Sequence, residues 1–169
     1  SNPFLLIQVF EQSSRLGCHL SMEAKRLIRE FLFLVDDAFR KSERMIQCFL
    51  IILRMENTFE TLDQMYETGF LEAFIPEFGK IIGRVQFDAY HIFPVGRHAL
   101  ETVRHLKRLS KGKDILLIDI FSDLSTPETL FLAGLFHDIG KIGKDHARKG
   151  VAITRNILKR FGYDKKRAE

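Results

Sequence analysis

The sequence GLFHDIGKIGKDHARKG, residues 134–150, changes character at its fourth residue. The preceding run FLAGLF (131–136) is apolar and uncharged, which is typical of a buried helix. His137 and Asp138 follow directly, and glycines, lysines and a further histidine come after them. An ionised Asp without partners at the end of a buried helix is costly, and a divalent cation would offset that cost. The stretch therefore predicts a buried helix that ends at a metal site.

The residue types at this pair restrict the metal and the other ligands. Imidazole and carboxylate together favour Mn²⁺, Fe²⁺, Co²⁺, Ni²⁺ or Zn²⁺ over Mg²⁺. Because His98 and His105 would lie about 10.5 Å apart on one helix, at most one of them can join His137 and Asp138. We favour His98, which opens its helix. His146, nine residues after His137, either reaches the same ion or holds a second one.

Positive charge is concentrated beside the His–Asp pair. Residues 141–169 hold ten Lys or Arg and three acidic residues, whereas the rest of the chain carries a net charge of −3. Most of these cations are expected on a solvated helix face, but the glycine-flanked Lys141 and Lys144 are predicted to contact an anionic substrate. No aromatic residues alternate with the basic ones, which disfavours nucleic acid as a partner.

Helical periodicity of apolar residues dominates the chain and predicts an all-α fold. Helices are expected at 27–38, 45–55, 60–66, 98–109, 130–136 and 151–161, with Gly69 and Gly162 as stops. Residues 115–121 fit a strand or a short helix. The sequence Ser-Thr-Pro-Glu at 125–128 predicts a helix start with a capping box.

Composition restricts the class of protein, and the positions of Pro and Gly indicate a domain boundary. Hydrophobic residues make up 46% of the 169, enough for a good core, and the longest apolar runs fall short of the roughly 20 residues of a spanning helix. Cys18 and Cys48 lack the spacing of a zinc site or a disulfide framework, so we expect a reduced, cytoplasmic protein. Pro and Gly between residues 75 and 96 predict an N-terminal helical region (1–83) followed by a second domain (84–169).

A histidine at a helix start, then FLAGLFHDIGK (131–141), resembles the HD-domain superfamily of metal-dependent phosphohydrolases, with His98, His137 and Asp138 in the motif positions. The spacing His146-x-x-x-Gly150 is similar to the third-histidine element of the two-metal members. The resemblance implies a helical HD-domain bundle over 84–169, preceded by a helical linker region. It also implies that His98, His137, Asp138 and His146 bind metal.

A closer resemblance covers more of the chain. FIPEFGKIIGRVQFDAYHIFPVGRHALETVRHL (74–106) and HDIGKIGKDHARKG (137–150) are similar to the bifunctional uridylyltransferase/uridylyl-removing enzymes of nitrogen regulation. The resemblance implies hydrolysis of the phosphodiester between UMP and a tyrosine of the PII signalling protein. In that reaction Asp138 would bridge metal and attacking water, and Lys141 would contact the phosphate.

Two departures from the family pattern accompany this resemblance. Acidic residues usually precede the first histidine, where this chain has Gly96-Arg97. The superfamily's last metal ligand is an Asp on a later helix, which residues up to 169 do not include, so we expect a partial HD domain. Two alternatives remain open: a phosphohydrolase of free nucleotides, and a catalytically inactive regulatory helical module.

Overall fold

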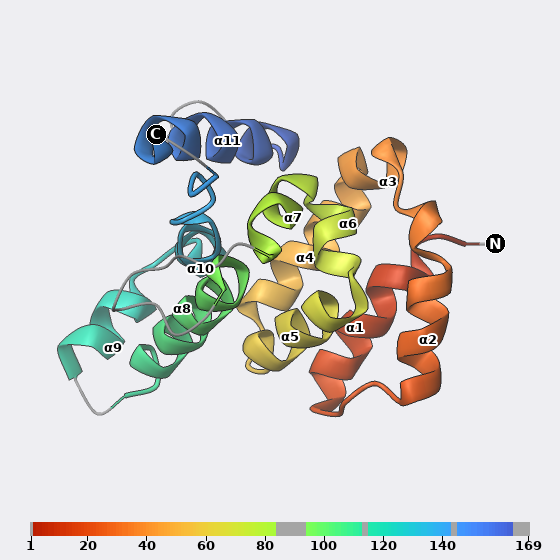
Figure 1. Cartoon of the computed structure of the whole chain (residues 1–169). Helices are drawn as coiled ribbons and strands as arrows, with labels where there is room; N and C mark the ends of the chain where they lie inside the picture. The colour runs from red at the N-terminus through yellow and green to blue at the C-terminus, as the bar shows by residue number, and fades with distance from the viewer. Residues whose placement is uncertain (1, 84–93, 113–114, 143–144, 164–169) are drawn as a thin grey trace.

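The structure, a computed structural model, describes residues 2–83, 94–112, 115–142 and 145–163, and in these ranges it contains helices and no strand (Figure 1). The helices are α1 (Leu5–Leu16), α2 (Met22–Glu30), the 3₁₀ turn η1 (Leu32–Leu34), α3 (Asp37–Lys41), α4 (Glu43–Arg54), α5 (Thr58–Thr68), α6 (Phe70–Phe74), α7 (Pro76–Ile82), α8 (Val95–Leu109), α9 (Ile115–Ser122), α10 (Pro127–Phe136) and α11 (His146–Arg160). The predicted all-α fold is confirmed.

The N-terminal helices and the helices that follow residue 94 pack against each other. Figure 1 shows α1–α3 at one side and α8–α11 at the other, with α4–α7 between them. Helix α10 packs against both α8 and α4, while α8 also contacts α5 and α7. The helix that ends at His137 is therefore held between the two parts of the chain.

Phenylalanine side chains join the two parts into one core. Phe74 lies 5.4 Å from Phe49 and 5.9 Å from Phe70, measured between ring centroids. Phe161, just after α11, packs on the same rings, 5.9 Å from Phe49 and 6.0 Å from Phe74. Pairs at these separations add about 0.5–1.5 kcal/mol each beyond the area they bury. The C-terminal end of α11 is thus anchored in the N-terminal core.

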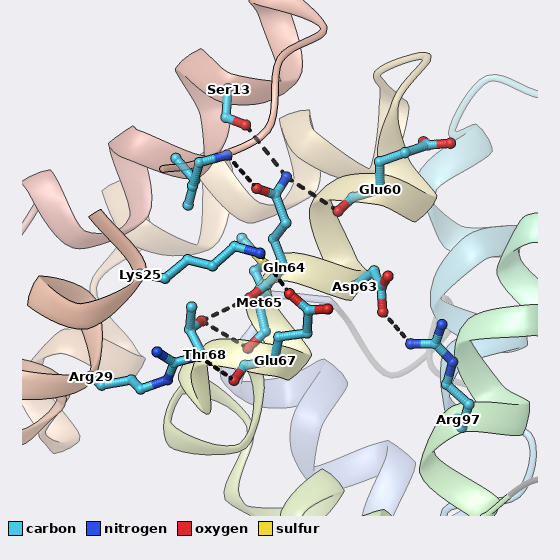
Figure 2. A network of polar contacts seen from close by, with 11 residues as sticks. Ser13, Lys25, Arg29, Glu60, Asp63, Gln64, Met65, Glu67, Thr68 and Arg97 are labelled. Atoms are coloured by element: carbon cyan, nitrogen blue, oxygen red, sulfur yellow. Dashed lines mark hydrogen bonds and ion pairs between the residues drawn. The ribbon is translucent and has the colours of Figure 1, made fainter. Parts of the chain in front are cut away.

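Polar side chains of α5 connect it to its neighbours (Figure 2). The buried Gln64 accepts a hydrogen bond from the Leu20 backbone N–H at 2.6 Å and donates to the Glu60 carbonyl at 3.3 Å. The adjacent residue Asp63 forms an ion pair with Arg97 in the first turn of α8. This pair fixes α5 to the start of α8.

Most helices with strong periodicity are where the sequence predicts them. The helices expected at 45–55, 60–66 and 98–109 correspond to α4, α5 and α8, and Gly69 ends α5 in the left-handed conformation. Residues 115–121, for which strand and helix both remained open, form helix α9.

The single helix predicted over residues 27–38 is wrong. Helix α2 ends at Glu30, η1 follows, and α3 begins only at Asp37. The Asp36 carboxylate accepts a hydrogen bond from the Phe39 backbone N–H at 2.9 Å, which starts a new helix at this point. Phe33 is largely exposed, so the apolar run Phe31–Val35 is not one buried helix face.

Two further local predictions are wrong. Helix α10 begins at Pro127 with Thr126 at its N-cap, but no side-chain cap hydrogen bond forms there. Glu128, the residue expected to complete the capping box, instead accepts two hydrogen bonds from Arg54. The last helix begins at His146 rather than at residue 151, so this histidine is the first residue of the helix.

None of the helices that the structure describes is long and apolar enough to cross a membrane.

Candidate metal centre

The start of α8 presents His98. Pro94 is the N-cap, and its carbonyl accepts a hydrogen bond from the His98 backbone N–H at 2.9 Å. A Cβ at position 96 would come within 3.0 Å of the Cα of Ile82 in α7, so Gly96 permits this close approach. Gly96 and Arg97 therefore hold the first turn of α8 against α7 and α5.

The chain turns sharply after α10 and presents the His–Asp pair. Backbone hydrogen bonds from Ile139 to Phe136 and from Lys141 to Asp138, both 3.0 Å, form this turn. Ile139 is fully buried and anchors the turn in the core. The apolar helix thus ends with two polar residues held at its tip.

Three side-chain atoms from α8 and this turn converge. The Nε2 atoms of His98 and His137 are 3.3 Å apart, and Asp138 Oδ2 lies 3.2 Å from His137 Nε2 and 3.7 Å from His98 Nε2. These residues form the one group of three or more His, Cys, Asp or Glu, among the described residues, that could hold a metal ion. We call His98, His137 and Asp138 the histidine–aspartate cluster.

The separations within the cluster fit a transition metal. Ligand atoms at about 2.0–2.2 Å from one ion lie roughly 3.0–3.5 Å from one another in tetrahedral or octahedral geometry. The three separations of 3.2, 3.3 and 3.7 Å are close to these values. Two imidazoles and one carboxylate favour Mn, Fe, Co, Ni or Zn over Mg. The residues present therefore fit a divalent transition metal.

A backbone carbonyl orients His137 for metal binding. His137 Nδ1 lies 2.8 Å from the Gly134 carbonyl oxygen. Because a carbonyl oxygen only accepts hydrogen bonds, Nδ1 carries the proton, and in the neutral ring the lone pair is on Nε2. That lone pair is on the nitrogen that lies next to His98 Nε2 and Asp138 Oδ2. A second partner of this kind is typical of metal-binding histidines.

Lys141 lies at the same cluster. Its ammonium nitrogen is 2.9 Å from Asp138 Oδ2, the oxygen that also meets both histidines. The Asp138 side chain is only 13% exposed, so this charge pair lies in a partly desolvated place. Lys141 therefore places a positive charge beside the predicted metal position.

A cleft of about 470 Å³ begins at His137 and follows α11. His146, Thr154 and Arg155 supply its polar lining, and Phe136 and Val151 supply apolar surface. His146 thus faces the same cleft as His137, although the structure does not bring it into the histidine–aspartate cluster.

The remaining candidates from the sequence lie outside the cluster or outside the described residues, and some residues near the site were not predicted. His105 is exposed two turns further along α8 and takes no part in the cluster, whereas Lys144 lies outside the described residues. Sequence reasoning missed the Gly134 carbonyl, Thr154 and Arg155. The signal for Thr154 was its spacing of eight residues from His146, which keeps both on one face of a helix.

Comparison with known proteins agrees with this geometry. Residues 95–169 match the HD domain model, and residues 1–74 match the model of the third domain of uridylyltransferase GlnD. The chain contains an HD domain. HD domains are metal-dependent, and His98, His137 and Asp138 lie within the matched residues. The resemblance noted in the sequence is confirmed.

Similar proteins carry one shared description, bifunctional uridylyltransferase/uridylyl-removing enzyme. The chain is 33% identical to the enzyme of Ruegeria pomeroyi over 95% of its own length and 18% of the relative. The chain is 36% identical to the enzyme of Methylococcus capsulatus, over 80% of this chain and 16% of the relative. It is 40% identical to the enzyme of Nitrosococcus oceani, over 75% of this chain and 15% of the relative. The HD domain and its preceding helices thus span less than a fifth of these relatives.

Proposed function

We propose that this chain is a metal-dependent phosphodiesterase centre that hydrolyses the bond between UMP and a tyrosine of the PII signalling protein. The observation that carries the proposal is the convergence of two imidazoles and one carboxylate at separations of 3.2–3.7 Å. The uridylyl-removing relatives, similar over most of the chain, support the substrate.

The proposed reaction transfers the uridylyl group, UMP, from the tyrosine oxygen to water. The water oxygen attacks phosphorus, the bond from phosphorus to the tyrosine oxygen breaks, and the phenolate leaves and takes a proton. A divalent transition metal at His98, His137 and Asp138 would acidify the water and offset negative charge on a phosphoryl oxygen. The products are UMP and the free tyrosine side chain.

The chain's own side chains would position the reactants. His98 and His137 contribute the lone pairs of their Nε2 atoms, and Gly134 holds the His137 ring in place. The Asp138 carboxylate accepts a proton from the attacking water. Lys141, 2.9 Å from Asp138, donates hydrogen bonds to the phosphate and stabilises the charge that develops there.

The cleft beside His137 suits the groups attached to the phosphate. Its volume of about 470 Å³ falls within the range of about 300–1,000 Å³ typical of small-molecule sites. His146 and Arg155 add hydrogen-bond donors along its wall. His146 would contact the substrate or hold a second ion, and Lys144 is proposed as a further substrate contact.

Metal content and UMP release test the proposal with one pair of variants. We expect the purified chain to retain a transition metal and, with Mn²⁺, to release UMP from uridylylated PII. Because His137 supplies a ligand, His137→Ala should lower bound metal and cut UMP release by at least about 100-fold. His105→Ala, an exposed histidine of α8 outside the cluster, is the matched control and should keep both.

The outcomes separate the candidate functions. Equal metal content in His137→Ala and the parent chain would remove the metal site. Cleavage of bis-(p-nitrophenyl) phosphate without UMP release would keep the hydrolase and remove the PII substrate. Dephosphorylation of UMP itself would favour a hydrolase of free nucleotides, and bound metal with no hydrolysis of any substrate would favour an inactive regulatory module.

A further inference from the structure

The C-terminal half of α8 lines a second cavity, distinct from the histidine–aspartate cluster. This cavity, about 370 Å³ in volume, lies between α8 and the start of α5. Its cationic lining is Arg104, Lys107, Arg108 and Lys111, and Phe59 and the carboxylates of Glu56 and Glu60 complete it. We call these seven residues the α8 groove. Lys107 comes nine residues after His98, about 13.5 Å along the helix axis, so the groove is remote from the metal ligands.

Positive charge in the α8 groove exceeds negative charge. Lys111 forms an ion pair with Glu56, and Arg104 pairs with Glu101 at 3.2 Å while its guanidinium lies 4.8 Å from the centre of the Phe59 ring. Arg108 forms no ion pair and no side-chain hydrogen bond with any residue that the structure describes. The four lining cations are therefore matched by three carboxylates, namely Glu56, Glu60 and the Glu101 partner of Arg104, and Arg108 pairs with none of them.

Lys107 is the central cation of the groove and lacks a carboxylate in contact. Its Nζ donates a hydrogen bond to the Met55 carbonyl at 2.8 Å, and it lies 4.0 Å from the centre of the Phe131 ring. An ammonium group has three N–H donors, of which Met55 uses one. Burial, and after it the neighbouring Lys111 ammonium, lowers the pKa of Lys107 to about 8. The Lys107 ammonium is thus removed from water without a carboxylate in contact to balance its charge.

We propose that the α8 groove binds a compact tetrahedral oxyanion, either free phosphate or sulfate or the phosphate group of a nucleotide. The anion would accept hydrogen bonds from Lys107 and Arg108 and would compensate the excess of positive charge. Bidentate contact with a guanidinium and direct contact with an ammonium are the usual means of phosphate recognition.

Binding should depend on pH through Lys107. The charged groups that line a cavity together with Lys107 are Arg54, Glu56, Glu60, Arg104, Arg108 and Lys111, while α9 and α10 contribute Phe121 and Phe131. With a pKa of about 8, about nine tenths of Lys107 is protonated at pH 7 and about one tenth at pH 9. If the bound anion keeps the ammonium charged, the Kd for sulfate should rise about tenfold between these pH values.

Titration with sodium sulfate at constant ionic strength, followed by ¹H–¹⁵N NMR with EDTA present, tests the proposal. Sulfate keeps the same charge from pH 7 to pH 9, so any change in affinity reports on the protein. We expect saturable shifts of the amides at 55–60 and 104–111. Linear, unsaturated shifts, or saturable shifts confined to residues 137–142, would overturn the proposal.

Variants separate a specific site from general attraction. Arg108→Gln should raise the Kd at least about threefold, and Lys159→Gln, another exposed cation without a described ion pair, should leave it unchanged. Equal effects of these two variants would refute the site. Lys107→Met should abolish the pH dependence. Since Lys107 also caps α4, the Arg108 variant decides the matter if Lys107→Met fails to fold.

A second titration identifies the source of the oxyanion. Inorganic phosphate and UMP are compared under the same conditions, again with EDTA. Tighter binding of UMP at the α8 groove supports a nucleotide, and equal binding supports a free oxyanion. If neither phosphate nor UMP saturates the groove, the proposal is refuted. The metal site is tested separately by His137→Ala, which leaves every groove residue intact.

Discussion

Replacing Gly140 with alanine places a methyl group where the backbone of α11 already lies. A Cβ built on Gly140 would be 2.1 Å from the His146 carbonyl oxygen, 2.5 Å from the Gly150 nitrogen and 2.7 Å from the Gly150 Cα. Ordinary contacts between such atoms are about 3.3–4.0 Å, so the backbones must separate by about 1 Å. The obstructing atoms are backbone and cannot rotate away. The turn after His137 and α11 would therefore move apart.

The cost of this separation follows from the contacts. Overpacking typically costs about 1–3 kcal/mol, and three backbone overlaps put Gly140→Ala at the upper end, about 3 kcal/mol. Alanine returns about 0.4–1 kcal/mol by reducing the entropy of the unfolded chain, which leaves a net loss of roughly 2–3 kcal/mol. For a chain of this size that loss lowers the Tm by about 5–10 °C.

Thermal unfolding followed by circular dichroism measures this effect, and Gly83→Ala supplies the matched control. A Cβ at Gly83 meets no heavy atom within 4 Å, so the control should be neutral or slightly stabilising. Bound metal in Gly140→Ala should also fall, since the turn holds His137 and Asp138. A Tm for Gly140→Ala within about 2 °C of the parent chain would refute the close approach of the turn and α11.

Two further predictions concern ion pairs that join the two parts of the chain. Glu128 is 4% exposed and accepts hydrogen bonds at 2.7 and 2.8 Å from Arg54, whose side chain is 53% exposed. Glu128→Gln should therefore lower the free energy of unfolding, measured by urea denaturation, by about 2 kcal/mol, a value between those typical of surface and of buried ion pairs. Glu30→Gln, at an exposed ion pair, should lower it by less than about 0.5 kcal/mol. Equal losses would contradict the burial argument. Burial raises the pKa of Glu77, but hydrogen bonds from Arg160 and its own backbone N–H outweigh burial and leave that pKa below 4.5. Its contribution to stability is present above about pH 4.5 and is lost as pH falls through the lowered pKa. Unfolding free energy measured from pH 6 to pH 3 should fall less steeply in Glu77→Gln, and an unchanged slope would contradict the assignment.

The strongest local patterns in the sequence identified most of the fold and the cluster. Helices α4, α5 and α8 have regular apolar spacing, and an apolar run that ends in His137 and Asp138 indicates a buried helix with a polar tip. Two histidines two turns apart cannot both reach one ion, and His98 is favoured over His105 because it opens its helix. These inferences rest on short-range geometry, which sequence spacing determines directly.

The remaining features depend on contacts between distant residues. Glu128 has the residue type and position of a capping-box member, but Arg54, 74 positions away, pairs with it instead. The interruption of the periodic run at 27–38 is a local exception, because Asp36 caps a new helix by accepting from Phe39, three residues further on. The excess of cations around Lys107 needs α4, α5 and α8 to be packed together. Spacing within one helix contains no information about such partners.

The geometry of the histidine–aspartate cluster depends on the N-terminal helices as well as on the HD domain. Ion pairs between described helices fix the HD helices to earlier ones: Arg97 of α8 pairs with Asp63 of α5, Glu128 of α10 with Arg54 of α4, and Arg160 of α11 with Glu77 of α7. Phe161 adds an apolar contact at the end of α11. The predicted boundary between residues 83 and 84 stays a prediction, but the buried core continues across it. Because α8 supplies His98 and the end of α10 supplies His137 and Asp138, a shift of α4 or α5 would change the separation of the ligands. Metal affinity should therefore respond to substitutions in the N-terminal helices that touch none of the three ligands.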